Sequence, residues 1–266
     1  MELTQKTKLG LIIISISLVV GIFQFLWLTF GPCRNKTDLV FMIDDSGSIK
    51  NADFEKTKNF VSSIVESKDI SVSKKSVNVA LCKFSNDAQW IGEPGFIDNI
   101  DEVLQDLKNT NRETGETNII GALEFVNGPV LSVGRKDYEE TTLIFLTDGE
   151  ATFEQAQQPL YQIKNVADNL KNKGVKIYGV GVGSKVKQEE INAIASSSEY
   201  VKSVDNFDEL SSLAKKIGEE ICVPNYWNLM FPVAFIAICF IGIYILDKKE
   251  ADKLDEETKG MTLTKV

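Results

Sequence analysis

A short apolar run at residues 39–43, followed at once by a polar cluster, is the feature of the sequence that most constrains the fold. The run is too short for a helix and is bounded by polar residues, which predicts a strand buried on both faces, as in a parallel sheet. Asp44, Ser46 and Ser48 follow at every second position, with Gly47 between the two serines. Carboxylate and hydroxyl oxygens are the ligands that Mg²⁺ and Mn²⁺ prefer, and Gly47 allows the backbone turn that lets both hydroxyls face one point. The segment therefore predicts a cation site at the end of a buried strand.

The length and charge of the chain limit the alternatives. A chain of 266 residues has room for one domain of about 200 residues with a full core, plus short appendages. The net charge is −9, which argues against nucleic acid as a partner. The sequence contains no His, no Gly-rich phosphate loop with a Lys, and no further pair of carboxylates suited to catalysis, so we do not expect an enzyme.

Segments with strand-like and helix-like patterns alternate through the middle of the chain. Strands are predicted at residues 77–84, 88–91, 141–146, 175–182 and 200–204. Helices are predicted at residues 53–67, 100–107, 155–172, 191–195 and 207–221. The alternation predicts an α/β fold with a doubly wound, mostly parallel sheet flanked by helices, similar to a Rossmann fold. Ligands bind at the carboxyl ends of the strands in such a sheet, and Asp44 is expected there.

Two further segments carry polar residues at comparable positions. Residues 115–123, Gly-Glu-Thr-Asn-Ile-Ile-Gly-Ala-Leu, place Thr117 in a loop just before a helix. Residues 143–150, Leu-Ile-Phe-Leu-Thr-Asp-Gly-Glu, place Asp148 just past the end of a buried strand. Together with Asp-x-Ser-x-Ser, they resemble the three segments of the metal-ion-dependent adhesion site of von Willebrand factor A domains. The resemblance covers about residues 38–221.

This resemblance implies a role for each of the five polar residues. Ser46, Ser48 and Thr117 would bind Mg²⁺ (or Mn²⁺) directly through their hydroxyls. Asp44 and Asp148 would hold it mostly through ordered water, or one of them directly. Such a set leaves the cation short of negative ligands, so a Glu or Asp of another protein can take the open position.

Two acidic residues lie beside the predicted ligands without matching the motif. Asp45 follows Asp44, and Glu116 precedes Thr117. We interpret both as solvated charges at the rim of the site. A role in tuning the partner is the alternative.

The cysteines refine the resemblance. Cys33 and Cys222 bracket the domain, which in an exported chain predicts a disulfide, because the ends of doubly wound domains can lie close together. This pair, the Gly-Glu-Thr loop and an apolar segment soon after Cys222 resemble the anthrax-toxin-receptor type of A domain. Integrin inserted domains share the metal motif but lack this layout. The additional domain and long tail of the receptor type are not matched, so its toxin binding is not expected here.

The N-terminal end predicts export. Lys6 and Lys8 precede an apolar run at residues 9–30, a pattern typical of a secretory signal. The run is also long enough to span a bilayer, so a cleaved signal peptide over residues 1–31 and a retained signal anchor both remain open. In either case we expect the domain over residues 33–222 to lie outside the cell.

A second apolar run, at residues 229–246, predicts a transmembrane helix. Trp227 stands at its outer edge, and Lys248 and Lys249 follow it, which predicts a short cytoplasmic tail over residues 247–266. The expected location is the plasma membrane. The chain would be a single-pass type I protein if the first segment is cleaved and a two-pass protein otherwise.

The sequence thus predicts a membrane-anchored domain that binds an acidic residue of an extracellular protein through Mg²⁺, as an adhesion protein or receptor. A bacterial envelope protein that works as an assembly or chaperone subunit is the alternative. Asn35 begins the sequon Asn-Lys-Thr, and a sugar there together with the Cys33–Cys222 disulfide would favour the first. Neighbouring genes for an ATPase and other A-domain proteins would favour the second.

Overall fold

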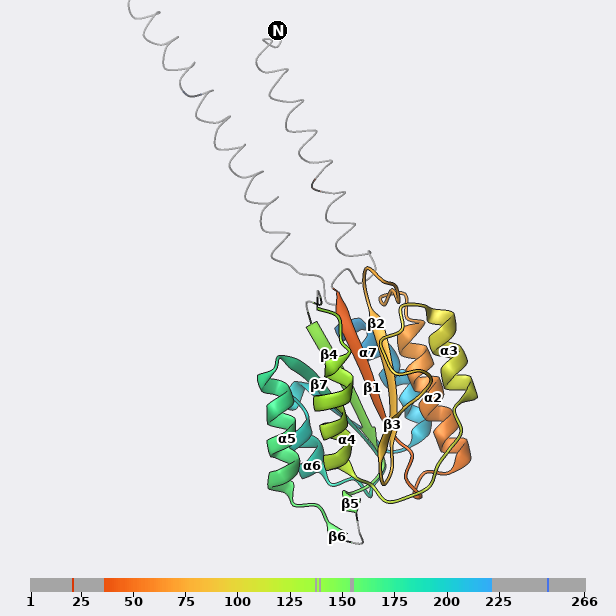
Figure 1. Ribbon diagram of the computed structural model, residues 1–266, viewed down its shortest axis with the longest axis vertical. Coiled ribbons are helices and arrows are strands. Elements are labelled where there is room, and N and C mark those ends of the chain that lie inside the picture. The colour runs from red at the N-terminus through yellow and green to blue at the C-terminus, as the bar shows by residue number, and fades with distance from the viewer. Residues whose placement is uncertain are drawn as a thin grey trace, which may run out of the picture. The chain divides into compact units, whose positions relative to one another are not determined.

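The computed structural model of the chain describes residues 36–136, 138, 140–153 and 156–221, with residues 21 and 248 as isolated positions. Within this part of the chain the main sheet has six strands in the order β3-β2-β1-β4-β7-β8 (Figure 1). They are β1 (Thr37–Asp44), β2 (Asn78–Phe84), β3 (Ala88–Trp90), β4 (Glu140–Thr147), β7 (Val175–Val182) and β8 (Val201–Val204). Every pairing is parallel except that of β3 with β2. The mostly parallel α/β sheet predicted from the sequence is confirmed.

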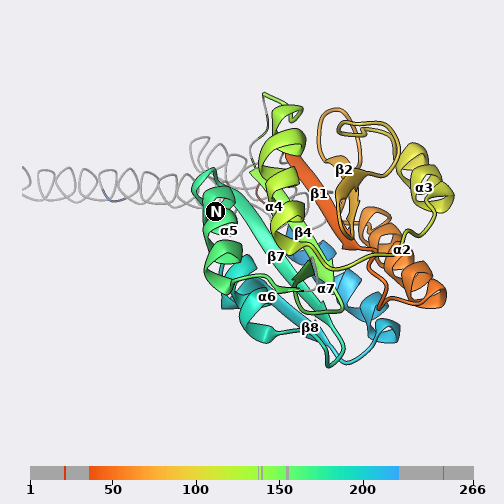
Figure 2. The same cartoon turned by 60° about the horizontal axis from the view of Figure 1, so that its bottom comes forward.

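Helices cover both faces of this sheet (Figures 1 and 2). One face packs against α2 (Asn51–Val65), α3 (Ile100–Asn109) and α7 (Leu210–Ile221). The other packs against α4 (Ile119–Phe125), α5 (Leu160–Asn172) and α6 (Gln188–Ile194). A π-helical turn at Val126–Val130 extends α4, and short 3₁₀ turns occupy Ser198–Tyr200 and Phe207–Glu209.

The central strand β1 explains why the first apolar run is continuous. All eight of its residues are buried. Leu39, Phe41 and Ile43 pack into the core on one face, and Val40 and Met42 pack into the core on the other. Successive side chains of a strand point to opposite faces, so the middle of a strand that is covered on both sides is apolar at consecutive positions, as residues 39–43 are. The position of β1 in the middle of two cores fixes where the polar residues after it lie.

The predicted helix boundary with the largest error is the start of α5 (Leu160–Asn172). The helix expected over residues 155–172 begins only at Leu160, and Pro159 stands at its N-cap. Before it, β5 (Thr152–Phe153) and β6 (Ala156–Gln157) form a small antiparallel pair. Proline has no backbone N–H and is tolerated at the start of a helix but not inside one. The end of the same helix is as expected, because Gly174 has a φ of 85° just after it.

Several expectations concern residues that the structure does not describe. These are the signal peptide or anchor over residues 1–31, the Cys33–Cys222 disulfide, the sequon at Asn35, the apolar run at 229–246 and the tail at 247–266. Among the described residues, no helix combines the length and the apolar character that crossing a membrane requires.

Candidate metal centre

Three segments bring the predicted metal residues to one edge of the sheet. Asp44 is the last residue of β1, and Asp148 follows the last residue of β4. These two strands pair in parallel, so their carboxyl ends meet at the same edge, at the bottom of Figure 1. Thr117 comes from the loop before α4, and its backbone pairs with Thr152 in an isolated bridge. Residues 73 positions apart in sequence, such as Asp44 and Thr117, therefore reach one site.

The three hydroxyls lie close to one another and to Asp148. Ser46 Oγ and Ser48 Oγ are 3.0 Å apart, and Ser48 Oγ donates a hydrogen bond of 2.6 Å to Asp148 Oδ1. A Cβ atom on Gly149 would stand 3.6 Å from Thr117 Oγ1 and 3.9 Å from Ser48 Oγ. Both hydroxyls thus border the same point of the Asp148 loop.

Asp44 is the fully buried carboxylate of the site. Its Oδ1 accepts a hydrogen bond of 2.8 Å from the backbone N–H of Ser46, and its Oδ2 accepts one of 2.6 Å from Thr147 Oγ1. Burial raises the pKa of Asp44 to about 6; the nearby Asp148 adds to this effect and the hydrogen bonds oppose it. Burial also raises the pKa of Asp148. Both carboxylates are therefore held where a nearby cation would stabilise their charged forms.

The set of donors fits a hard divalent cation. The site offers two carboxylates and three neutral hydroxyls, all of them oxygen ligands. Across the described residues there is no group of three or more His, Cys, Asp or Glu side chains that could hold a metal. A cation bound here would meet at most two negative charges from the chain. It would consequently keep an attraction for a further anionic ligand.

The prediction that Asp45 is a solvated rim charge is wrong, because its side chain is 1% exposed. Its Oδ2 accepts hydrogen bonds from Lys83 Nζ at 3.0 Å and from the backbone N–H of Glu113 at 2.6 Å. Its Oδ1 accepts one of 3.3 Å from Arg112 Nε. A sequence signal existed, since Lys83 stands in the otherwise buried strand β2 and a buried lysine needs a partner. Glu116 is half-buried, and its backbone N–H donates a hydrogen bond of 2.7 Å to Asn86 Oδ1.

Arg112 is a residue of the site that the sequence patterns missed. Besides Asp45, its guanidinium donates to the backbone carbonyl of Ser46 at 2.8 Å and to Asn51 Oδ1 at 3.3 Å. The backbone N–H of Gly47 donates to the carbonyl of Gly115 at 2.8 Å. Residues 112–115 therefore hold the turn that presents Ser46 and Ser48.

Glu190 fixes the second loop of the site and was also missed. It is 4% exposed, and its Oε2 accepts a hydrogen bond of 2.9 Å from the backbone N–H of Ala151. Burial raises the pKa of Glu190. The backbone N–H of Thr152 donates to the carbonyl of Thr117 at 3.0 Å, which joins this loop to the third segment. The loops that carry Asp148 and Thr117 thus support each other.

Comparison with known proteins gives the family. Residues 38–216 match the sequence model of the von Willebrand factor type A domain. The chain belongs to this family. It is 32% identical over 194 residues to the collagen alpha-6(VI) chain of Mus musculus, which covers 70% of this chain and 8% of the collagen chain. It is 29% identical over 197 residues to human matrilin-1, covering 73% of this chain and 38% of matrilin-1. The chain therefore matches only a minor part of the length of these relatives.

Solved structures share this A-domain fold. Proximal thread matrix protein 1 from the mussel byssus, solved with a zinc-occupied MIDAS motif, has a TM-score of 0.62 and 26% identity. The match covers 72% of this chain and 47% of the mussel protein. The von Willebrand factor domain of the pilus tip protein Mfa5 from Porphyromonas gingivalis has a TM-score of 0.57, with 71% and 95% coverage. At 12% identity this second likeness shows the fold alone.

Proposed function

We propose that this A domain binds an acidic residue of an extracellular protein partner through a bound Mg²⁺ ion. The observation that carries the proposal is the gathering of three hydroxyls and two carboxylates at one edge of the sheet. Ser46, Ser48 and Thr117 would hold the cation directly, and Asp44 and Asp148 would hold it through water, or one of them directly. The cation supplies the positive charge that attracts the partner's carboxylate.

The placement of the hydroxyls supports this division of roles. Ser48 Oγ lies within hydrogen-bonding distance of both Ser46 and Asp148. Asp44 Oδ1 and Oδ2 are each already engaged by one hydrogen bond, from Ser46 N–H and Thr147 Oγ1. Carboxylates that are engaged in this way are suited to orient hydroxyl ligands and water around a cation.

The relatives support an extracellular binding role over catalysis. Collagen alpha-6(VI) and matrilin-1 are extracellular matrix proteins, and the mussel protein is a thread matrix protein with a metal in its motif. The choice of Mg²⁺ over Zn²⁺ rests on the ligands, because hydroxyls and carboxylates are harder than the Cys and His that Zn²⁺ favours. The bacterial envelope alternative has only a likeness of fold in its favour.

The cellular setting is part of the same proposal. The apolar run at residues 229–246 would anchor the chain in the plasma membrane, with the positively charged Lys248 and Lys249 on the cytoplasmic side. The domain would lie outside, closed by a Cys33–Cys222 disulfide. This proposed layout resembles that of the anthrax-toxin-receptor type of A domain.

A binding experiment with matched variants tests the proposed function. Beads carrying the full chain are incubated with solubilised extracellular matrix in Mg²⁺ or in EDTA. We expect captured protein in Mg²⁺ only, and its loss in Thr117→Ala. Thr114→Ala is the control, because Thr114 is an exposed threonine three residues earlier in the same loop. Equal capture in Mg²⁺ and EDTA, or by Thr117→Ala and the wild type, would contradict the proposal.

A further inference from the structure

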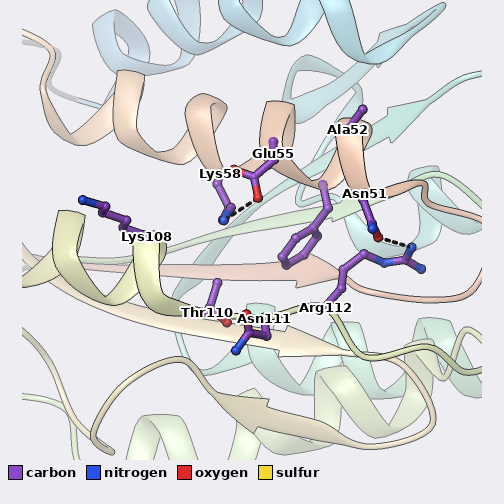
Figure 3. A pocket seen from close by; sticks show the side chains of 9 residues that line it. Asn51, Ala52, Glu55, Lys58, Lys108, Thr110, Asn111 and Arg112 are labelled. Carbon is purple, nitrogen blue, oxygen red and sulfur yellow. Dashed lines mark hydrogen bonds and ion pairs between the residues drawn. The ribbon is translucent and has the colours of Figure 1, made fainter.

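A polar groove of about 530 Å³ lies beside the metal centre, between the first turns of α2 and the segment that follows α3 (Figure 3). Asn51, Glu55 and Lys58 come from α2. Lys108 lies in the last turn of α3, and Arg112 follows in the loop. The metal-dependent function proposed above makes no use of this groove.

The groove is positively charged in a chain whose net charge is −9. Lys58, Lys108 and Arg112 line it, but Lys58 is paired with Glu55 and Arg112 with the buried Asp45, so Lys108 supplies the positive charge that remains. Lys58 Nζ lies 2.7 Å from Glu55 Oε1, with the Lys58 side chain 10% exposed. Lys108 is exposed, and none of the ion pairs found in the described part of the chain involves it. A concave surface with this balance attracts an anion.

Arg112 joins the groove to the metal centre. Its Nη2 donates to the carbonyl of Ser46 at 2.8 Å, and Ser46 is a proposed metal ligand. Its Nη1 donates to Asn51 Oδ1 at 3.3 Å, on the wall of the groove, as the dashed line in Figure 3 marks. A peptide segment bound at the metal can therefore extend directly over the groove.

We propose that this groove binds a second acidic residue of the same partner segment whose first acidic residue binds the metal. The inference rests on the proposed function and adds to it a partner motif of two acidic residues. Lys108 would pair with the second carboxylate, and Thr110 and Asn111 offer polar side chains to the peptide backbone.

A peptide fits the groove better than a sulfated polysaccharide does. A long polyanion needs an extended basic surface, and of the three cations that line this groove two are already paired with carboxylates of the chain. The carboxylate of Glu55, whose side chain is 64% exposed, would repel a dense row of sulfates. One carboxylate side chain, by contrast, meets a single region of positive charge.

The test uses the full chain in mild detergent and synthetic peptides at high density on beads, where multivalency makes weak contacts measurable. One peptide carries a single Glu in a Gly/Ser background. A second set carries another Glu at two to six residues' spacing, and a third has Gln in its place. With Mg²⁺ we expect one spacing to lower the half-saturating concentration roughly fivefold to tenfold relative to the single-Glu peptide.

Two substitutions test whether the groove causes this gain: one removes a positive charge from it and the other removes a negative charge. Lys108→Gln should abolish the gain, and Glu55→Gln should increase it about twofold to threefold, because it removes the competing carboxylate. Lys75→Gln is the control, because Lys75 is an exposed lysine before β2, at the opposite end of the sheet. It should leave the gain unchanged.

The outcomes separate this inference from the function on which it rests. Mg²⁺-dependent binding of the single-Glu peptide with no gain at any spacing overturns the groove and leaves the proposed function standing. A gain that survives in Lys108→Gln also overturns the groove. The groove proposal is also overturned if Lys108→Gln abolishes binding of heparin and leaves binding of the peptides unchanged. Binding of all peptides that is equal in Mg²⁺ and EDTA overturns the proposed function and the inference with it.

Discussion

Two buried aspartates near the ends of β1 are held in different ways. Asp38, near the amino end, is 1% exposed, and its Oδ1 lies 2.7 Å from Arg135 Nε. Its Oδ2 accepts the backbone N–H of Arg135 at 3.1 Å. Asp44, at the carboxyl end, is fully buried, and the groups that donate hydrogen bonds to it, which include Ser46 N–H and Thr147 Oγ1, are neutral. None of the ion pairs among the described residues involves Asp44.

The comparison distinguishes a structural charge from a functional one. Burial of an unpaired carboxylate is unfavourable, and a buried cation offsets much of that cost. The fold supplies this cation to Asp38 through Arg135, and to Asp45 through Lys83 and Arg112. Asp44 lacks one, and we infer that a bound metal ion provides it.

Removal of the Arg135 cation, at the amino end of β1, should have the largest effect on the free energy of unfolding. Arg135→Met leaves the Asp38 charge buried without its partner and should lower the free energy of unfolding by about 3–5 kcal/mol. Urea unfolding of the full chain, followed by circular dichroism, measures this loss. Lys136→Met is the control, because Lys136 is the adjacent exposed lysine. A loss of less than about 1 kcal/mol would mean that the pair is no more important than a surface ion pair.

Neutralisation of Asp44, at the carboxyl end of β1, should instead raise the free energy of unfolding. Burial raises the pKa of Asp44 from 3.8 to about 6, so the folded state binds its proton more tightly than the unfolded state does. Stability contributed by the protonated form is therefore lost as the pH rises from about 4 to 6. Without metal at pH 7, Asp44→Asn should raise the free energy of unfolding by about 2–3 kcal/mol.

A pH series of urea unfolding in EDTA checks this sign. The wild type should lose stability relative to Asp44→Asn between pH 4 and pH 6, and the difference should be constant above pH 7. Addition of Mg²⁺ should shrink the difference, because the cation stabilises the ionised form. A wild type that is more stable than Asp44→Asn in EDTA at pH 7 would refute the prediction.

Substitution of Arg112, which holds the turn after β1, should change the free energy of unfolding less than the two substitutions above. Arg112→Gln removes the bonds from Arg112 to Asp45 and to the Ser46 carbonyl. Lys83 still pairs with Asp45. We expect a loss of about 1–2 kcal/mol in unfolding free energy and severalfold weaker Mg²⁺ binding. Unchanged Mg²⁺ affinity would show that Arg112 does not position the metal loop.

The sequence predicted the fold and the site through patterns that are local. The apolar run before Asp44 identified β1, and the parallel strand order brought Asp44, Asp148 and Thr117 to one edge. Pro159 was a local signal against a helix from residue 155. For the burial of Asp45 the sequence contained only a partial signal: Lys83 in the buried strand β2 needs an acidic partner, but no local pattern identifies Asp45 as that partner or Arg112, 67 positions from Asp45, as its second cation.

The role of Glu190 in holding the Asp148 loop could not be predicted from a local pattern either. The interaction with the positive end of the helix dipole is enough to explain a glutamate in the first turn of a helix, so the position of Glu190 gives no sign of its burial. Only the tertiary packing of α6 brings its carboxylate to the backbone N–H of Ala151. The sequence therefore identified groups that would bind a cation, whereas the groups that hold those residues in place required the structure.

Calorimetric titration of Mg²⁺ into the full chain tests the central claim most directly. The wild type should bind one Mg²⁺ per chain, Asp44→Asn should lose this binding, and Asp87→Asn, a change at an exposed aspartate, should retain it. Binding of Mg²⁺ with the same stoichiometry and affinity in the wild type and Asp44→Asn would show that the cation lies elsewhere. The carboxylate that the fold leaves without a cation would then not be a metal site.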